Sequence, residues 1–482
     1  MSAETAVRTT PVSETGSRVV VFDSVDAPAD AGALAALERG VADADLAAPA
    51  VALPDFHHKG DKEMPSSIAV ATEGTIRSTF TSASLNCGMT LVSLGAERPS
   101  DRAVGDFFQG VRERYPYPPT YRRDLSVAEV IRAAAEGSDF AADRFAIDPA
   151  ELDRVEERGR IDVERFGGRE RVRRELPLSV RQLSRIRFGT IGPSNHFVEL
   201  QEVEEIFDPD AAALLGLQLG QTTLQYHGGG GSLPGELGLL FGRRKRYPRA
   251  VQAQMAVQKP LYHLGRARSR QELQLRRRLY FSGDCPPVER DSPEGERLLL
   301  ANAMAMNYGF AFRLSTYSSL RALAVRSFAT SHIRLVVDSP HNTIYEEQID
   351  GEKALVHRHN AARAYPAARM AGHPVFGAIG QAVLIPGTDR TSSYVCTAAD
   401  AASQSLYSAC HGAGSSIDRF VAAGLSGPDP HGRVTLRFDY SGRTPEERPH
   451  LDDRGVDDAV QTLTRNGIVR PVARLRPFAV LN

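Results

Sequence analysis

The sequence lacks three features that would assign it to a class at once: an excess of charge of one sign, a long apolar run and closely spaced cysteines. Its 58 basic residues nearly balance its 59 acidic residues, giving a net charge of −1, so no overall field indicates a nucleic-acid or membrane partner. No stretch approaches the roughly 18 apolar residues of a membrane span. Because the first residues also lack a basic region followed by an apolar core, we expect no secretory signal and a cytoplasmic location.

The four cysteines are Cys87, Cys285, Cys396 and Cys410, and no two of them form a CxxC pair. Their wide spacing argues against a disulfide framework and against a structural zinc knuckle. Reduced thiols agree with the expected compartment.

The length of 482 residues allows one elaborate domain or two to three ordinary ones. Residues 1–17 are rich in Thr, Ser and Glu, which predicts a mobile tail, and the run from Arg18 to Phe22 predicts the first strand. Residues from about 124 to 187 are Arg-rich with helical periodicity, as in Leu125 to Glu136 and Glu151 to Val163. We interpret this segment as a charged helical insert.

Beyond Gly189, short β-rich runs alternate with turns and helices. Residues 333–337 and 381–385 predict strands, and residues 294–306 predict a helix. Because strands and helices do not alternate regularly and no internal repeat is present, the pattern argues against a barrel or a doubly wound sheet. It favours an α+β fold.

Histidines and one cysteine stand beside polar or glycine-rich turns at several places. The segments concerned are Pro54 to Gly60, Leu85 to Met89, Gly189 to Glu199, Tyr226 to Ser232, Asp338 to Asn342 and Ser408 to Ser415. Each segment alone also fits an ordinary polar turn, a buried cysteine or a flexible glycine loop. Taken together, imidazole and thiolate groups favour Zn²⁺, Fe, Co or Mn over Ca²⁺ or Mg²⁺, which prefer oxygen ligands.

In their order along the chain, these segments resemble motifs of the RtcB family of RNA ligases. The resemblance is carried by Pro54-Asp-Phe-His57, Cys87-Gly-Met89, Gly192 to Glu199, His341-Asn342, Val356-His-Arg358, Gly380 to Gly387, Cys410 to Gly414 and Val472 to Pro477. It covers roughly residues 50–482. The resemblance implies a single large mixed α/β domain over residues 18–482, and an enzyme that joins an RNA 3′-phosphate, or a 2′,3′-cyclic phosphate, to a 5′-hydroxyl using GTP and Mn²⁺.

The resemblance also implies roles for individual residues. Cys87, His227 and His341 would bind one Mn²⁺, with Cys87 shared and His196 serving a second ion; Zn²⁺ or Co²⁺ are alternative metals. His411 would be guanylylated, Asn195 would contact phosphate and Glu199 guanine. The remaining nucleotide-binding residues implied are Asn342, Pro386, Gly387, Gly412, Ala413 and Gly414. The expected partners are RNA, such as tRNA halves or damaged RNA, together with GTP or GMP and an archease-like activator.

Several positions depart from the family pattern. Ser84 replaces an aspartate that binds the second metal ion, His359 replaces a lysine, and Asn482 stands where a lysine contacts the nucleotide. Gly229, Gly230 and Gly231 replace Gly-Ser-Arg, Ser415 replaces an arginine, and a residue near Asp453 replaces a tyrosine that stacks on guanine, whereas Arg363 is retained.

Three hypotheses remain open after these substitutions. The first is an active ligase or guanylyltransferase, and the second is a nucleotidyltransferase of altered nucleotide or acceptor specificity. The third is a non-catalytic RNA-binding relative, in which the basic runs Arg243–Arg246 and Arg276–Arg278 contact phosphate. The alternative for these runs is a solvated helix face.

Overall fold

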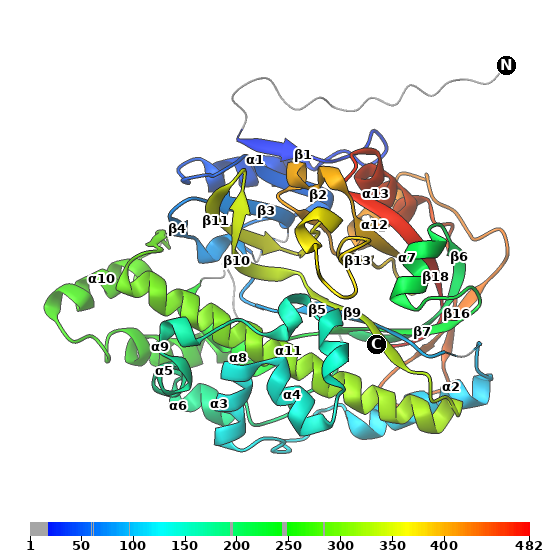
Figure 1. Ribbon diagram of the computed structural model, residues 1–482, viewed down its shortest axis with the longest axis horizontal. Helices are drawn as coiled ribbons and strands as arrows, with labels where there is room; N and C mark the ends of the chain where they lie inside the picture. The colour runs from blue at the N-terminus through cyan, green and yellow to red at the C-terminus, as the bar shows by residue number, and fades with distance from the viewer. Residues whose placement is uncertain are drawn as a thin grey trace.

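A computed structural model describes residues 18–482 apart from 59, 61, 96, 193–195, 243–247 and 283–284. The predicted N-terminal tail therefore lies outside the described residues. Helices and strands are mixed along the chain (Figure 1), which confirms the α+β prediction. The predicted strands at residues 18–22, 333–337 and 381–385 correspond to β1, β9 and β13.

The larger sheet, as far as the described residues show it, has nine strands. A path of seven runs in the order β13 (Ala382–Ile385), β14 (Ser393–Ala398), β18 (Val469–Leu481), β6 (Phe197–Ile206), β7 (Thr222–Gly228), β5 (Gly88–Ser93) and β9 (Arg334–Pro340). β16 (Val434–Phe438) pairs with β18 in parallel, and β17 (Glu446–Pro449) pairs with β16. The pairs along the main path are antiparallel.

The smaller sheet has five strands among the described residues. Their order is β1 (Val19–Val21), β2 (Ala50–His57), β3 (Ser66–Thr72), β11 (Glu352–His359) and β10 (Asn342–Ile349). Two short ladders join β12 (Ala361–Arg363) to β15 (Ser408–Cys410) and β4 (Thr75–Ile76) to β8 (Val288–Glu289). Since β9 runs into β10 across a single residue, His341, the two sheets meet at that histidine.

The helix α11 (Pro293–Phe328) runs the length of the lower layer (Figure 1). Ser292 caps it through a hydrogen bond from the Gly295 amide, and Pro293 occupies the first turn, where no amide partner is needed. Most residues from Leu298 to Tyr317 are buried, because α2, α3, α4 and α8 cover one side of the helix and the larger sheet lies on the other. The predicted helix at 294–306 is the first part of α11.

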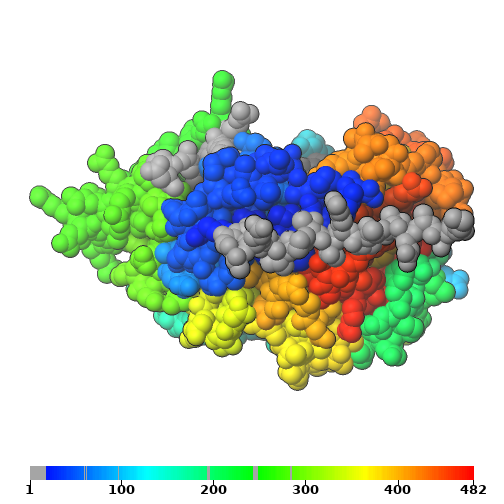
Figure 2. Space-filling model, turned by 90° about the horizontal axis from the view of Figure 1, so that it is seen from above, coloured from blue at the N-terminus to red at the C-terminus, as the bar shows by residue number. Residues whose placement is uncertain are grey.

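The other helices surround these layers. They are α1 (Ala31–Val41), α2 (Asp101–Arg114), α3 (Val127–Glu136), α4 (Ser138–Phe145), α5 (Gly168–Glu175), α6 (Leu178–Leu183), α7 (Pro209–Leu215), α8 (Ser232–Phe241), α9 (Arg249–His263), α10 (Arg270–Phe281), α12 (Gly414–Ala422) and α13 (Arg454–Arg465), with short 3₁₀ turns η1 (Ser78–Phe80), η5 (Ala367–Met370) and η6 (Asp400–Ser405). α9 and α10 form an arm that projects to the left in Figures 1 and 2. None of the helices among the described residues is both long and apolar enough to cross a bilayer.

The Arg-rich segment 124–187 is largely helical. The predicted helix at Leu125 to Glu136 is α3, which Ser126 and Glu129 close with a reciprocal capping box. The predicted helix at Glu151 to Val163 is wrong: the chain forms the 3₁₀ turns η2 (Pro149–Arg154) and η3 (Glu156–Gly159) instead, followed by η4 (Glu164–Phe166). Positive φ angles at Glu157, Arg158 and Gly159 interrupt any continuous helix there.

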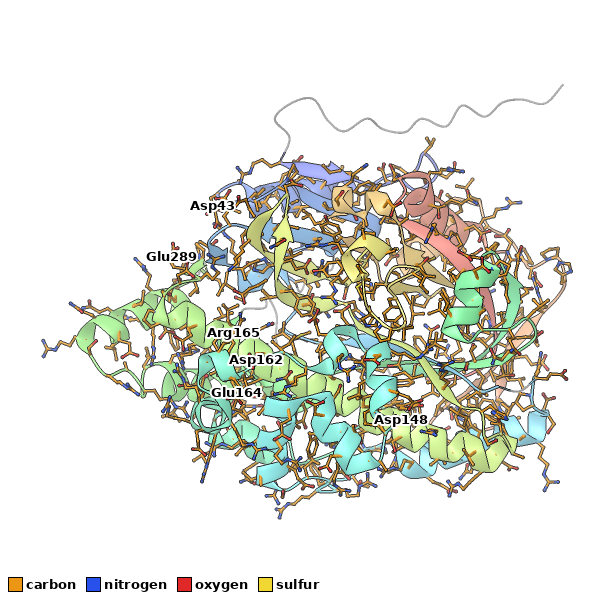
Figure 3. The ribbon with its side chains drawn as sticks, in the orientation of Figure 1. Asp43, Asp148, Asp162, Glu164, Arg165 and Glu289 are labelled. Carbon is orange, nitrogen blue, oxygen red and sulfur yellow. The ribbon has the colours of Figure 1, made fainter. Side chains whose placement is uncertain are left out.

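An ion pair connects this segment to the smaller sheet. Arg165, labelled with Asp162 and Glu164 in Figure 3, pairs with Glu346 of β10. On the upper surface, segments from the two ends of the chain lie side by side (Figure 2), and Ser24 donates a hydrogen bond to Asp458 at 2.8 Å. Segments near the two ends of the described chain are therefore in contact.

Candidate metal centre and nucleotide cavity

Strand register gathers the predicted metal ligands at one edge of the larger sheet. Gly88, at the start of β5, pairs with Gly228 at the end of β7 and with Pro340 at the end of β9. Cys87, His227 and His341 are each within one residue of these three paired positions. Antiparallel pairing thus places a strand start between two strand ends, and three residues far apart in sequence become neighbours.

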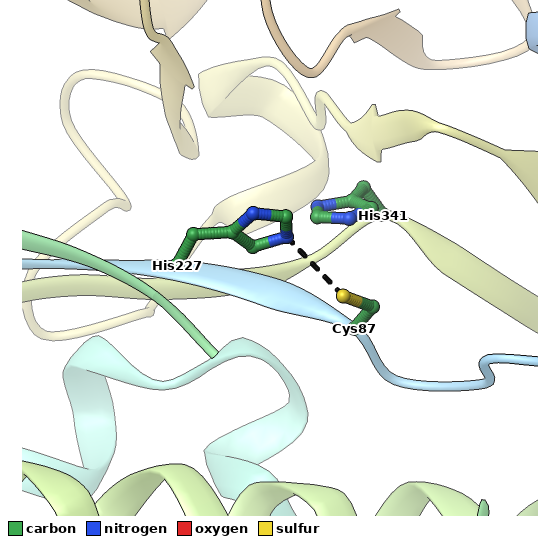
Figure 4. Close-up of side chains that lie close together, drawn as sticks. All are labelled: Cys87, His227 and His341. Atoms are coloured by element: carbon green, nitrogen blue, oxygen red, sulfur yellow. Dashed lines mark hydrogen bonds between the residues drawn. The ribbon is translucent and has the colours of Figure 1, made fainter. Parts of the chain in front are cut away.

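These three side chains lie close enough to share one ion (Figure 4). One ligand atom from each of Cys87, His227 and His341 lies within 4.8 Å of the others. The Cys87 Sγ is 3.2 Å from the His227 Nε2, and the His341 amide donates to the Cys87 carbonyl oxygen at 2.9 Å. All three residues are buried.

His196 stands beside this group rather than within it. It precedes β6, whose first residue Phe197 pairs with His227. The His196 Nε2 is 3.8 Å from the Cys87 Sγ, and its ring centroid is 5.0 Å from that of His227. Cys87 is therefore close to His196 as well as to His227.

Burial sets the protonation of these side chains in the metal-free protein. Desolvation lowers the pKa of His196, and it lowers the pKa of His341 further with the help of nearby histidines and Arg313. Neutral imidazoles keep the lone pair that a metal ligand needs. Burial raises the pKa of Cys87 to about 11, although Arg313 acts in the opposite direction.

The residues fit a transition metal. The Nδ1 atom of His341 is buried and has no hydrogen-bond partner among the described residues, which is costly for a polar atom unless something else binds there. Two imidazoles and a thiolate form a donor set suited to Zn²⁺, Co²⁺ or Mn²⁺ rather than to Ca²⁺.

A buried ion pair lies next to the site and contacts the residue before Cys87. Arg313 of α11 pairs with Asp338 of β9 through two hydrogen bonds of 2.6 and 2.8 Å. The same guanidinium donates to the side-chain oxygen of Asn86 at 2.7 Å and to its backbone oxygen. Asn86 has a positive φ, and it is the residue before Cys87. In the sequence, the only signal for these interactions was Arg313 itself, a single arginine within an apolar helical run.

His411 lines the same cavity, of about 1050 Å³, as the metal-ligand cluster. Its ring centroid is 4.3 Å from that of His341. It follows β15 directly, and α12 begins three residues later at Gly414. The Asp55 carboxylate accepts a hydrogen bond from the Ser416 amide at 3.0 Å, and this bond connects the first turn of α12 to the end of β2. Burial raises the pKa of Asp55 to about 6.

The predicted nucleotide residues divide into three groups. Those that line the cavity are Asn342, Pro386, Gly387, Gly412, Ala413 and Gly414. Asn195 lies outside the described residues. Glu199 is buried in β6, away from the cavity lining, and accepts a hydrogen bond from Gln201 at 2.6 Å. Burial raises the pKa of Glu199 to about 8. The contact of Glu199 with guanine stays a prediction.

The positions that depart from the family pattern are mostly at the cavity. Ser84, Gly229, Gly230, Gly231, His359 and Ser415 all line it. Burial and the nearby Lys62 lower the pKa of His359 to about 3, so a neutral ring stands where the pattern has a cation. Asn482 donates from its side chain to the His196 carbonyl oxygen at 3.2 Å. Asp453 pairs with Arg476 at 2.6 Å and accepts from the Ser392 hydroxyl at 2.9 Å.

Two basic features have structural partners. Arg363 is buried, pairs with Glu157 and lies 3.8 Å from Glu156, so it does not face the cavity. Arg276 is buried and donates to Glu294 at 2.6 Å, which contradicts its predicted phosphate contact. The run Arg243–Arg246 lies outside the described residues.

Several polar residues of the cavity wall were assigned no individual role from the sequence. His57, Lys62 and Asp418 line the cavity together with the predicted ligands. His57 belongs to the Pro54-Asp-Phe-His57 motif, so a signal for it was present, whereas nothing near Lys62 or Asp418 distinguishes them from surface charges.

A comparison with known proteins identifies the family. Residues 39–482 match the family model described as tRNA-splicing ligase RtcB. Because the match spans most of the sequence, the chain belongs to the RtcB family.

Individual relatives differ in how much of their length is matched. The chain is 28% identical over 363 residues to the tRNA-splicing ligase RtcB of Pyrococcus abyssi, an alignment that covers 72% of this chain and 36% of the relative. It is 26% identical over 437 residues to that of Thermococcus kodakarensis, covering 85% and 82%. It is 30% identical over 300 residues to the RNA-splicing ligase RtcB of Mycobacterium tuberculosis, covering 60% and 63%. The chain thus spans between a third and two fifths of several archaeal relatives.

Proposed function

We propose that this chain is a metal-dependent guanylyltransferase and RNA ligase. It joins an RNA end that carries a 3′-phosphate, or a 2′,3′-cyclic phosphate that is first opened by water to the 3′-phosphate, to a 5′-hydroxyl. The observation that carries the proposal is the position of His411, whose ring lies 4.3 Å from that of His341 in the Cys/His/His cluster. A nucleophile beside a metal cluster suits chemistry in which charge develops on phosphate oxygens.

In the first step an imidazole nitrogen of His411 attacks the α-phosphorus of GTP. A P–N bond forms, the bond to the β-phosphate oxygen breaks, and pyrophosphate leaves with the electron pair. Mn²⁺, or Zn²⁺ or Co²⁺ in its place, held by Cys87, His227 and His341, would supply positive charge to the phosphate oxygens. Burial lowers the pKa of His341 and of the neighbouring His196, which favours the neutral imidazole with a free lone pair.

In the later steps the RNA is activated and joined. An oxygen of the RNA 3′-phosphate attacks the His411-bound phosphorus and takes the GMP, which releases the imidazole. The 5′-hydroxyl of the second RNA end then attacks the activated 3′-phosphorus, loses its proton and displaces GMP. The cavity orients these groups, which lowers the entropic part of the barrier.

Two glycines of the cavity wall are required by tight packing against other protein atoms. A Cβ on Gly229 would lie 3.0 Å from the His196 ring, and one on Gly387 would meet the Ser392 carbonyl oxygen at 2.2 Å. Both positions therefore favour glycine, and their backbone amides carry no side chain that would cover them. With Ser415 and Gly231 in place of arginines, backbone amides carry more of the anion recognition here.

The natural RNA belongs to the same proposal. The relatives' names assign tRNA splicing or RNA splicing to those proteins, and we extend this to tRNA halves or damaged RNA as the substrate of this chain. An archease-like activator would act on the guanylylation step.

Radiolabelled GTP tests the proposal directly. With Mn²⁺ and GTP labelled at the α-phosphate, the wild type is expected to acquire an acid-labile label, and His411→Asn is expected to acquire none. His431→Asn, which changes an exposed histidine, serves as the matched control and should be labelled as wild type. An unlabelled wild type, tested with Mn²⁺, Zn²⁺ and Co²⁺ in turn, would contradict the proposal.

A second candidate, altered nucleotide specificity, is favoured by Asp453. An aspartate has no aromatic ring on which a guanine could stack. Its carboxylate is instead paired with Arg476 and accepts a hydrogen bond from Ser392. Labelling in competition with unlabelled GTP, ATP, CTP and UTP decides between the candidates: guanine specificity predicts that only GTP competes.

A further inference from the structure

A second cavity of about 310 Å³ adjoins the first. Its wall consists of the end of α2, the following loop from Tyr115 to Asp124, and the segment from Arg187 to Gly192. Thr190 and Gly192 line both cavities. The two cavities therefore share part of their walls, and a ligand in the second lies next to the catalytic cavity.

The second cavity is basic. Arg114, Arg122 and Arg187 line it together with a single acidic residue, Asp124. That carboxylate pairs with Arg122 at 2.5 Å, whereas neither Arg114 nor Arg187 forms an ion pair with any residue that the structure describes. Two guanidiniums thus remain without a protein carboxylate, which favours an anionic ligand.

The cavity also presents exposed aromatic rings. Tyr117 in the wall is 53% exposed, and Tyr121 beside it is 81% exposed. The Arg187 guanidinium lies 5.3 Å from the centre of the Tyr121 ring. Aromatic rings alternating with guanidiniums are the combination that binds single-stranded nucleic acid, because bases stack on the rings while the cations contact phosphates.

Hydrogen bonds join the two loops that form the wall. The Asp124 amide donates to the Arg185 carbonyl oxygen at 2.8 Å, the Phe188 amide donates to the Asp124 carboxylate at 3.0 Å, and the Arg187 amide donates to the Arg122 carbonyl oxygen at 3.1 Å. Arg187 itself has a φ of 58°, which costs energy for a residue with a side chain. The wall is therefore held in one shape before any ligand arrives.

We propose that this second cavity binds a single-stranded RNA segment next to the end that is joined. A nucleobase stacks on Tyr117, and the flanking phosphates contact Arg114 and Arg187. The inference rests on the proposed function for the identity of the polymer, and it adds a binding site outside the metal and nucleotide cavity. Duplex RNA fits poorly because its bases are already stacked on each other.

Fluorescence anisotropy with a short, single-stranded RNA that ends in a 3′-phosphate tests the site. Loss of stacking in Tyr117→Ala is expected to raise the Kd by at least about fivefold, while Tyr117→Phe retains the ring and binds as wild type. Arg114→Gln and Arg187→Gln are each expected to reduce the slope of log Kd against log salt by about 0.7. Arg39→Gln is the matched control, because Arg39 is an exposed arginine on α1, on the opposite side of the molecule from α2 in Figure 1.

Labelling of the variants by radiolabelled GTP tests the proposed function separately from the RNA site. All five variants should accept label from GTP as the wild type does, which also shows that they are folded. Unchanged RNA affinity in Tyr117→Ala and in both arginine variants would overturn the site, as would equal affinity for duplex RNA of the same sequence. A wild type that binds RNA through Tyr117 without accepting label would refute the guanylyltransferase and leave the RNA site standing.

Discussion

Removing one charge from the buried pair beneath Cys87 is expected to destabilise the protein strongly. Arg313 and Asp338 are 0% and 1% exposed, and two hydrogen bonds of 2.6 and 2.8 Å join them. Asp338→Asn keeps the shape but leaves a buried guanidinium without its counter-charge, which typically costs about 3–5 kcal/mol. The free energy of unfolding in urea, measured without metal by circular dichroism, should fall by that amount.

The matched control is an exposed pair of the same residue types. Arg132 and Asp143 lie 3.2 Å apart and are 36% and 68% exposed, so Asp143→Asn should cost less than about 1 kcal/mol. Adding Arg313→Met to Asp338→Asn removes the stranded charge and should recover part of the loss. Equal costs for Asp338→Asn and Asp143→Asn would refute the reasoning.

The same pair should affect the metal site, since Arg313 also holds Asn86 next to Cys87. Co²⁺ bound through a thiolate gives a ligand-to-metal charge-transfer band. We expect Asp338→Asn to weaken this band and to lower Co²⁺ affinity by about 10-fold to 100-fold, as removal of a supporting residue generally does. An unchanged band and affinity would show that the pair does not position the ligand.

Three further predictions concern single residues. Cys87→Ser should abolish the Co²⁺ thiolate band and reduce binding in a metal titration, and retention of the band would show that Cys87 is not a ligand. Ser84→Asp should increase the number of Mn²⁺ ions bound per chain, counted by equilibrium dialysis with elemental analysis, because a carboxylate is a better ligand than a hydroxyl; an unchanged count would contradict this. The pKa of Glu199 is raised from 4.5 to about 8, so the folded state holds a proton that the unfolded state releases, and stability should fall as pH rises through this window. Glu199→Gln should flatten the dependence of urea unfolding on pH by up to a few kcal/mol, and an equally steep profile would refute the assignment.

The sequence predicted much of the fold because its local signals agreed with the tertiary structure. Leu125 to Glu136 combines helical periodicity with a capping box and forms α3 as expected. The stretch from Glu151 to Val163 has similar composition but forms 3₁₀ turns, because Glu157 and Arg158 adopt positive φ angles and Glu157 pairs with Arg363, which is distant in the sequence. No local pattern encodes such contacts, so the helix prediction failed there.

In the candidate site, too, the sequence predicted some features and the tertiary structure decided others. The amino-acid sequence by itself determined the ligand types and the order of the motifs, which were enough to indicate a metal, a nucleotide and the family. Only the tertiary structure decided that Cys87, His227 and His341 meet, because strand register sets which residues stand side by side. It also decided that Arg276 is structural and that His359 is neutral, since burial and partners control charge. Both depend on contacts between residues distant in the chain, and these form only when it folds.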